Sequence, residues 1–218
     1  GREISRVLWQ HVSALPRVRV AADARAVRLL VESGVCVGAR YVAGGGIVDA
    51  RASATLLATG GAGRVFRETT NPPVATGDGV ALAWQAGAAV ADMEFVQFHP
   101  TVMAVPDTPR FLLSEALRGD GAWLLNVHGE RFMRRYEPAG ELASRDLVAR
   151  AMVKEAARTG APVTLSMRHL DPDWVRRRFP TLAAACRERG LDLALDAVPV
   201  SPAAHYVMGG VATDIDGR

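Results

Sequence analysis

Two histidines, a serine and an arginine in the second half of the chain have side chains that bind small anions. His99 ends a short apolar segment before a proline, and His205 lies in a stretch rich in proline and glycine. Imidazole and hydroxyl groups donate hydrogen bonds to carboxylates, and a guanidinium adds a positive charge. Together with Ser114 and Arg145, these histidines would suit a cleft for a small dicarboxylate. Each of them taken alone is explained at least as well by a structural hydrogen bond.

Arg145 stands where a positive charge is unfavourable. The segment Ser144-Arg145-Asp146 is predicted to open a helix with Ser144 as its N-cap. A cation in the first turn opposes the helix dipole, at a cost of up to about 1 kcal/mol. A nearby anion would remove this cost. The sequence leaves open whether that anion is a ligand or a carboxylate such as Glu141.

Glycine-rich turns in the first half of the chain are candidates for a cofactor site. Gly60, Gly61 and Gly63 follow an apolar segment, where backbone amides can approach a phosphate or a flat ring. The dinucleotide fingerprint G-x-G-x-x-G is not met, because Phe66 stands at the third glycine position. Asp78 opens an alanine-rich segment, where it either caps a helix or holds a ribose hydroxyl. The pattern alone favours an ordinary turn.

Composition limits the classes of function. The chain has 218 residues, 49% of them hydrophobic and 22% charged, which is typical of a folded globular protein. No apolar run is long enough to span a membrane. The net charge is +3 and the basic run Arg176–Arg178 is interpreted as a solvated helix face, so nucleic acid is not expected as a partner. The histidines lack metal-ligand spacing, and the two cysteines, in no redox motif, indicate a reducing compartment such as the cytoplasm.

The elements that must position these residues follow from periodicity and turn signals. Helices are predicted at 4–15, 78–90, 144–158 and 173–189, the last with a break at Pro180, and a helical turn is predicted at 112–117. Strands are predicted at 17–21, 26–32, 35–43, 54–58, 95–98 and 163–166, with a tight turn at Ser33-Gly34 between the second and the third. A hairpin is predicted at 122–133 and a loop-like tail at 199–211. This order predicts an α/β part with an inserted β-meander, followed by an α+β part.

The motifs together resemble the succinate dehydrogenase/fumarate reductase flavoprotein family over nearly the whole chain. The matching segments are Ala58–Gly63, Thr76–Gly79, Glu94–Thr101, Leu142–Asp146 and His205–Gly210. The resemblance implies FAD as the cofactor. It implies FAD contacts from Arg25, Ala26, Thr59, Gly60, Gly61 and Asp78.

The resemblance also implies roles around the substrate. Arg145 matches the catalytic arginine that handles the proton, and the substrate-binding residues are His99, Ser114, Glu115 and His205. The segments Phe111–Ala116 and Pro202–Tyr206 are most similar to members that oxidise L-aspartate to iminoaspartate in NAD biosynthesis. Electrons would pass to oxygen or fumarate, with quinolinate synthase as a partner. The alternatives are a succinate dehydrogenase or fumarate reductase flavoprotein, and a dicarboxylate-binding module without catalysis.

The resemblance further implies a domain plan. Residues 1–92 would be part of an FAD-binding Rossmann-like domain, 93–198 a capping domain over the substrate, and 199–218 a return to the FAD-binding domain. The family's glycine fingerprint and acidic ribose ligand would precede Gly1, and a further substrate arginine would follow Arg218. We therefore expect an internal fragment that binds FAD poorly by itself.

Overall fold

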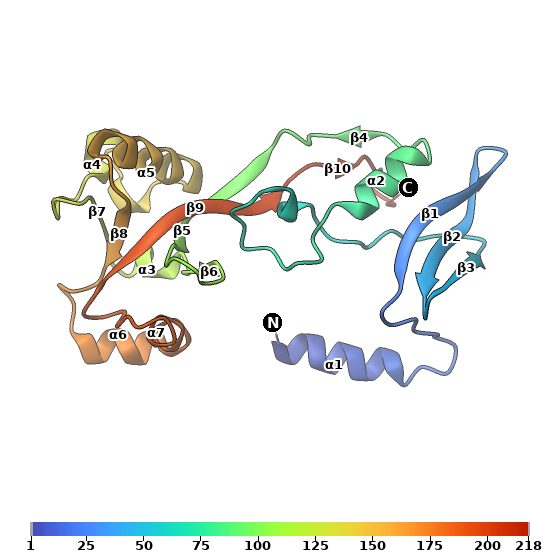
Figure 1. Ribbon diagram of the computed structural model, residues 1–218, viewed down its shortest axis with the longest axis horizontal. Helices are drawn as coiled ribbons and strands as arrows, with labels where there is room; N and C mark the ends of the chain where they lie inside the picture. The colour runs from blue at the N-terminus through green and yellow to red at the C-terminus, as the bar shows by residue number, and fades with distance from the viewer. Residues whose placement is uncertain (1, 218) are drawn as a thin grey trace. The chain divides into compact units, whose positions relative to one another are not determined.

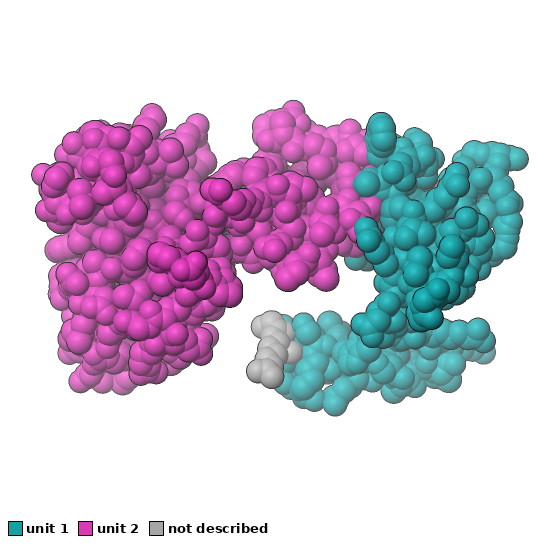
Figure 2. Space-filling view, in the orientation of Figure 1, with its two compact units in different colours: residues 1–58, 81–89 teal, residues 59–80, 90–218 magenta. Residues whose placement is uncertain are grey.

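The computed structural model describes residues 2–217, which form two compact units (Figures 1 and 2). The first unit comprises residues 1–58 and 81–89, and the second comprises residues 59–80 and 90–218. These limits differ from the predicted domain boundary at residue 92, and the functional assignment of the domains stays a prediction. No helix within residues 2–217 is long and apolar enough to cross a membrane.

The first unit contains the predicted β-meander. Strands β1 (Arg25–Glu32), β2 (Val35–Ala43) and β3 (Gly46–Arg51) pair antiparallel in sequence order. Ser33 and Gly34 join the first two strands and both have positive φ, as a type I′ turn requires. Helix α1 (Arg2–Ser13) lies two residues before its predicted bounds, and α2 (Asp78–Gln85) is shorter than predicted.

The second unit is built on an antiparallel sheet. Within the described residues its strand order is β6-β5-β9-β8-β7, and the strands are β5 (Val96–Met103), β6 (Phe111–Leu112), β7 (Trp123–Leu125), β8 (Val163–Ser166) and β9 (Ala197–Val207). The short strands β4 (Val90–Ala91) and β10 (Gly210–Val211) pair separately. The sheet positions the histidine-bearing strands β5 and β9 side by side (Figure 1).

Helices complete the second unit and its apolar core. They are α3 (Ala116–Gly119), α4 (Met133–Tyr136), α5 (Arg145–Thr159), α6 (Pro172–Arg178) and α7 (Pro180–Arg187), with 3-10 turns at Gly63–Val65 and Gly140–Leu142. Leu113, Leu117, Val148, Met152 and Leu165 are fully buried in this core. Proline at the first position of α7 causes the predicted break between α6 and α7, because it cannot donate to the preceding turn.

The prediction of a loop-like tail is wrong. Residues 197–207 form β9, which lies between β5 and β8 in the sheet. Prolines obscured this strand, since proline cannot donate a ladder hydrogen bond and is typical of strand edges and bulges. The pairing of β9 with β5 is irregular at Pro202. Ala203 pairs with His99 and Ser201 pairs with Val102, so the register shifts at this proline. The chain thus keeps an interior strand despite its prolines.

The predicted strands at 17–21 and 54–58 are also wrong. Both segments lack strand structure, and no described strand pairs with either of them. A strand requires a neighbour for its backbone N–H and C=O groups, which periodicity alone does not supply. The predicted helical turn at 112–117 is divided between β6 and α3. In the predicted hairpin, β7 is the first arm, and a single bridge joins Leu125 to Arg131.

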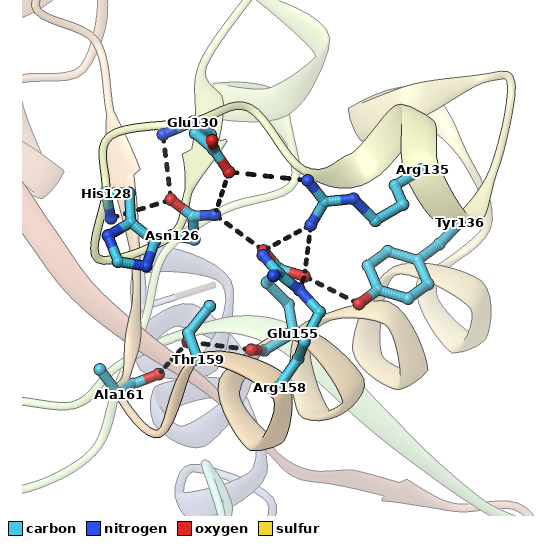
Figure 3. Close-up of polar contacts among 9 residues, drawn as sticks. All are labelled: Asn126, His128, Glu130, Arg135, Tyr136, Glu155, Arg158, Thr159 and Ala161. Carbon is cyan, nitrogen blue, oxygen red and sulfur yellow. Dashed lines mark hydrogen bonds and ion pairs between the residues drawn. The ribbon is translucent and has the colours of Figure 1, made fainter.

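A buried carboxylate anchors the C-terminal half of α5 (Figure 3). Glu155 is fully buried and accepts hydrogen bonds from Asn126 Nδ2 and Tyr136 Oη, each at 2.8 Å. Arg158 Nη2 lies 2.7 Å from Glu155 Oε1, and Arg135 Nη1 lies 3.1 Å from the same carboxylate. These donors, Arg158 first, hold the pKa of Glu155 far below its usual value. The cluster ties α5, whose first residue is Arg145, to α4 and to the turn after β7.

Candidate functional site

The two histidines singled out in the sequence come together in the second unit. His99 lies on β5 and His205 on β9, and their ring centroids are 5.4 Å apart at an interplanar angle of 66°. His99 is buried, with 1% of its surface exposed, whereas His205 is half-buried. The antiparallel pairing of β5 with β9 brings together residues that are far apart in the sequence.

Hydrogen bonds to Nδ1 orient both imidazoles. The backbone N–H of Thr101 donates to His99 Nδ1 at 3.3 Å. A neutral imidazole that accepts at Nδ1 carries its proton on Nε2, so His99 presents Nε2–H as a donor. The Thr70 hydroxyl lies 2.8 Å from His205 Nδ1. Asn71 Nδ2 donates to the backbone carbonyl of His205 at 2.7 Å and fixes the strand beneath it.

The environment keeps both histidines neutral. Burial lowers the pKa of His99 to about 4, and the positive charge of Arg145 acts in the same direction. Burial and Arg145 also lower the pKa of His205. At neutral pH the two rings are therefore uncharged hydrogen-bonding groups beside a guanidinium.

Glu115 is the carboxylate that compensates Arg145 at the start of α5. Its Oε2 accepts from Arg145 Nε at 3.0 Å and Nη2 at 2.8 Å, while Arg145 Nη1 donates to Gln97 Oε1 at 2.8 Å. On its other side, Glu115 Oε1 accepts from Arg118 Nη2 at 2.7 Å. The two cations lower the pKa of Glu115, the hydrogen bond from Arg145 most of all. Glu115 thus holds Arg145 in a fixed orientation between β5 and α3.

The structure answers the question that the sequence left open at Arg145. The anion partner is a carboxylate, but it is Glu115; Glu141 instead binds Arg131, with 2.9 Å between Oε2 and Nη2. Ser144 occupies the N-cap position as predicted, yet its hydroxyl donates to Asp146 and makes no capping hydrogen bond to the backbone. The first turn of α5 therefore depends on Glu115 to stabilise its cation.

A cavity of about 660 Å³ adjoins Arg145 in the second unit. Gln97 and Arg145 contribute to its wall, and most of the rest is apolar, including Val96, Phe98 and Val153. Ser114 lies beside Glu115, and its hydroxyl accepts from the N–H of Ala116 at 3.2 Å. Within the described residues, no hydrogen bond joins Ser114 to His99, Arg145 or His205. The structure thus brings His99, Glu115, Arg145 and His205 together, with Ser114 next to them in the chain.

The predicted cofactor residues of the second unit form one tightly packed loop. The carbonyl of Gly61 accepts from the N–H of Gly77 at 3.3 Å, and Gly60 has a φ of +73°, which glycine adopts readily. A Cβ on Gly79 would lie 1.7 Å from Thr59 Oγ1, so the two segments pack together with no space for a side chain. A Cβ on Gly60 or Gly61 would meet nothing within 4 Å. The exposed backbone of Gly60 and Gly61 therefore fits a cofactor that approaches closely.

Asp78 is the first residue of α2, and its Oδ1 accepts from the Thr76 hydroxyl at 2.9 Å. Arg25 and Ala26 belong to the first unit, where they begin β1 opposite Val42 and Tyr41 of β2. Within residues 2–217, no group of His, Cys, Asp and Glu side chains is arranged to hold a metal ion.

Sequence reasoning missed three side chains that contact the side chains of Arg145, Glu115 and His205. Gln97 binds Arg145, Arg118 binds Glu115, and Thr70 binds His205. Gln97 lies in the Glu94–Thr101 motif, which marked the segment around it as a site candidate. Arg118 follows Glu115 by three residues, a spacing at which side chains on a helix can contact each other, so the pair could have been predicted. Nothing in the sequence connected Thr70 to His205, because the contact depends on how the loop after Gly63–Val65 reaches β9.

Comparison with known proteins identifies the family of the chain. The model of the FAD binding domain family matches residues 1–218. The chain is 48% identical to L-aspartate oxidase of a Nostoc species, over 100% of this chain and 39% of that protein. It is also 48% identical to L-aspartate oxidase of Agrobacterium fabrum, over 100% of this chain and 41% of that protein. The chain thus spans about two fifths of the length of these curated relatives.

Solved structures confirm the relation to the fumarate reductases that the sequence motifs indicated. A quinol-fumarate reductase with menaquinol molecules superimposes with a TM-score of 0.85 at 34% identity, over 95% of this chain and 39% of that chain. A flavocytochrome c3 fumarate reductase in its open conformation gives a TM-score of 0.70 at 25% identity, over 99% of this chain and 48% of that chain. With its full length matched by the family model, the chain belongs to the FAD-binding domain family, whose cofactor is FAD.

Proposed function

We propose that the protein carrying this chain oxidises L-aspartate to iminoaspartate with FAD, passes the electrons to oxygen or fumarate, and supplies the route to NAD. The observation that carries the proposal is the convergence of His99, His205 and Arg145 in the second unit. This set of two neutral donors and one cation suits a small diacid anion. The similarity to proteins named L-aspartate oxidase supports aspartate as that diacid.

The histidines bind and orient the substrate in this proposal. His99 offers Nε2–H because its Nδ1 accepts from Thr101. His205 offers Nε2–H when the Thr70 hydroxyl donates to its Nδ1. Each ring would donate to a carboxylate oxygen of the substrate, and the Ser114 hydroxyl would add a third donor. Holding both carboxylates fixes the carbon that is oxidised and lowers the entropic part of the barrier.

Arg145 supplies the charge. We assign this guanidinium the stabilisation of negative charge on the substrate, with the amine proton passing to water. Glu115 and Gln97 occupy three of its nitrogens and hold the group still before substrate arrives. A fixed charge of this kind needs no reorganisation during the reaction.

The loop at Thr59, Gly60 and Gly61, with Asp78 and with Arg25 and Ala26, would hold FAD. When bound, FAD supplies the two-electron oxidation by accepting a hydride from the substrate. Residues 1–92 and 199–218 would then serve FAD binding, and 93–198 would cover the substrate. The open space at Gly60 and Gly61 supports this assignment for the loop.

The test uses the complete protein. Purified with FAD, it should show a flavin spectrum that aspartate bleaches without oxygen and that oxygen or fumarate restores. Arg145→Ala should abolish turnover and leave the flavin spectrum unchanged. Near-normal turnover by this variant would refute the role of Arg145. A flavin that aspartate never reduces would refute the proposed activity and favour a binding module without catalysis.

A second candidate is a succinate dehydrogenase or fumarate reductase flavoprotein. The TM-score of 0.85 to a quinol-fumarate reductase favours it, because the same diacid-binding residues would serve succinate. Flavin reduction by succinate but not by aspartate, with the complete protein, would select this candidate.

The proposal includes a partner and a compartment. Iminoaspartate is an imine that water hydrolyses, so a quinolinate synthase that consumes it promptly would be a natural partner. The thiols of Cys36 and Cys186 are both free, which supports the reducing cytoplasm as the location. Co-purification of quinolinate synthase activity with the complete protein from cytoplasmic extracts tests both points.

A further inference from the structure

Thr101 is a buried polar residue next to the candidate site. It lies on β5 two residues after His99, and none of its surface is exposed. Because it has no exposed surface, Thr101 cannot touch a substrate itself. Any effect of its side chain on the site must therefore pass through the residues to which it is hydrogen-bonded.

The backbone of Thr101 holds the ring of His99. The N–H of Thr101 donates to His99 Nδ1 at 3.3 Å, at the point where the pairing of β5 with β9 shifts register. This bond leaves Nε2 as the nitrogen of His99 that carries the proton. Thr101 thus fixes the tautomer of a ring to which the proposed function assigns a substrate carboxylate.

The hydroxyl of Thr101 holds the segment that carries Ser114. Thr101 Oγ1 donates to the carbonyl of Leu113 at 2.9 Å, and the N–H of Leu113 donates to the carbonyl of Thr101 at 3.0 Å. Strand β6 is two residues long and ends at Leu112. The two bonds to Thr101 extend the attachment of this edge to β5 by one residue, up to the residue that precedes Ser114.

Ser114 depends on this attachment more than Glu115 does. The carboxylate of Glu115 is held by ion pairs with two arginines, at 2.7 and 2.8 Å. The hydroxyl of Ser114 accepts from the N–H of Ala116, two residues further along the chain, and this bond does not tie it to the sheet. The position of Ser114 therefore follows from the attachment of Leu113 to Thr101.

We infer that Thr101 is a positioning residue for diacid binding, because it fixes the Ser114 hydroxyl relative to the ring of His99. This role rests on the proposed function, in which both groups donate to one diacid. Leu113 is fully buried, so removing the Thr101 hydroxyl would leave the Leu113 carbonyl without this donor and without water to replace it. The segment that bears Ser114 would then be free to move, and the two donors would no longer match the carboxylates.

Two substitutions in the complete, FAD-loaded protein separate the hydroxyl from packing. Thr101→Val keeps the shape of the side chain and removes its O–H, whereas Thr101→Ser keeps the O–H and removes a methyl group. The ligand is fumarate, a four-carbon diacid that cannot be reduced by a flavin already oxidised, and its binding is followed in the flavin absorption spectrum. Thr101→Val should raise the Kd for fumarate roughly tenfold, and Thr101→Ser should stay within about twofold of native. Native affinity in Thr101→Val, an equal loss in both variants, or no fumarate binding to the native protein would overturn this role.

Thr159→Val is the matched control for stability. Thr159 Oγ1 donates to the backbone carbonyl of Glu155 at 3.0 Å, at the end of α5 opposite to Arg145. The control therefore loses a hydroxyl–carbonyl bond of the same kind outside the candidate site. Both valine variants should lower the midpoint of urea unfolding, whereas only Thr101→Val should weaken fumarate binding. A similar loss of fumarate affinity in Thr159→Val would make the effect one of general stability and overturn the role of Thr101.

Steady-state kinetics keep this role apart from the proposed function. With aspartate, Thr101→Val should raise KM roughly tenfold and leave kcat within about threefold of native, because Glu115 and Arg145 keep their ion pair. A fall in kcat with an unchanged KM would show that Thr101 does not act through substrate binding. A flavin that aspartate never reduces would instead refute the proposed activity, and the Kd for fumarate would still decide the role of Thr101.

Discussion

His99 and His205 face each other edge to face, 5.4 Å apart between ring centroids, on the paired strands β5 and β9. The strands bring the rings together next to a register shift in which Pro202 faces Pro100 and Thr101. Burial and the nearby guanidinium of Arg145 keep both rings uncharged. The pair is therefore built to donate hydrogen bonds, while the charge of the site resides on Arg145.

The lowered pKa of His99 makes stability depend on pH. Its folded pKa of about 4 lies below the unfolded value near 6.5, so the unfolded chain takes up a proton first as the pH falls. Between pH 7 and 4.5 this uptake should remove about 2 kcal/mol of stability. His99→Gln, which cannot protonate, should lose about 2 kcal/mol less over the same range in urea unfolding of the complete protein. Identical pH dependence in both proteins would contradict a buried, neutral His99.

Removing the hydroxyl of Thr70 should impair substrate binding through His205. Thr70→Val keeps the size of the side chain but leaves His205 Nδ1 without its partner at 2.8 Å. Losing this hydrogen bond, worth about 1 kcal/mol, should lower kcat/KM for the diacid roughly five- to tenfold, mainly through KM. Thr108→Val is the control, because its hydroxyl binds only the Val105 carbonyl in a loop. If both variants matched the native KM, Thr70 would not position His205.

Glu115→Gln should disorient Arg145. The amide keeps the shape of the carboxylate but removes the negative charge that forms ion pairs with both Arg145 and Arg118. We expect turnover to fall roughly ten- to hundredfold, in line with the loss of a preorganised charge. The flavin spectrum should not change, because Glu115 lies outside the FAD loop. The exposed Glu188→Gln should behave as the native protein does, and a similar loss of activity in both variants would remove the special role of Glu115.

The open backbone at Gly61 gives a direct test of the cofactor site. A Cβ at this position meets no protein atom within 4 Å, so Gly61→Ala should leave the thermal stability of the FAD-free protein within about 0.5 kcal/mol of native. The added methyl group would enter the space reserved for FAD, so FAD affinity should fall at least tenfold in a fluorescence titration. Native FAD affinity in Gly61→Ala would mean that FAD does not approach the backbone here.

Glu155→Gln should destabilise the second unit. The change removes the buried negative charge that Arg158 and Arg135 share, while Arg135 keeps a longer ion pair with Glu130, at 3.6 Å between Nη2 and Oε2 (Figure 3). Because both guanidinium groups are 45% exposed and can be hydrated, we expect the loss of the charged hydrogen bonds to cost about 1–3 kcal/mol. Because the pKa of Glu155 is lowered in the folded state, its contribution is present above the usual carboxyl pKa and is lost as the pH falls below it. The exposed pair of Glu3 and Arg6 offers the control, since solvent screens this pair and Glu3→Gln should leave the midpoint of urea unfolding unchanged. Urea unfolding at pH 7 measures both variants.

The sequence by itself determined the elements whose signals are local. The turn at Ser33 and Gly34, the helix that begins at Arg145 and ends before Gly160, and the strand Val163–Ser166 all lie where they were predicted. Turn glycines, caps and side-chain periodicity act within a few residues, so they can be recognised without the rest of the chain. The motifs also indicated the flavoprotein family and FAD, which the family match and the relatives bear out.

Only the tertiary structure decided which of these residues meet. β9 is a strand because β5 and β8 supply hydrogen bonds on both sides of it, despite its prolines. The partner of Arg145 proved to be Glu115, and the partner of His205 proved to be Thr70. Such contacts join residues that are distant in sequence, and they depend on sheet order and register. No local pattern encodes these, because they follow from the packing of the whole unit.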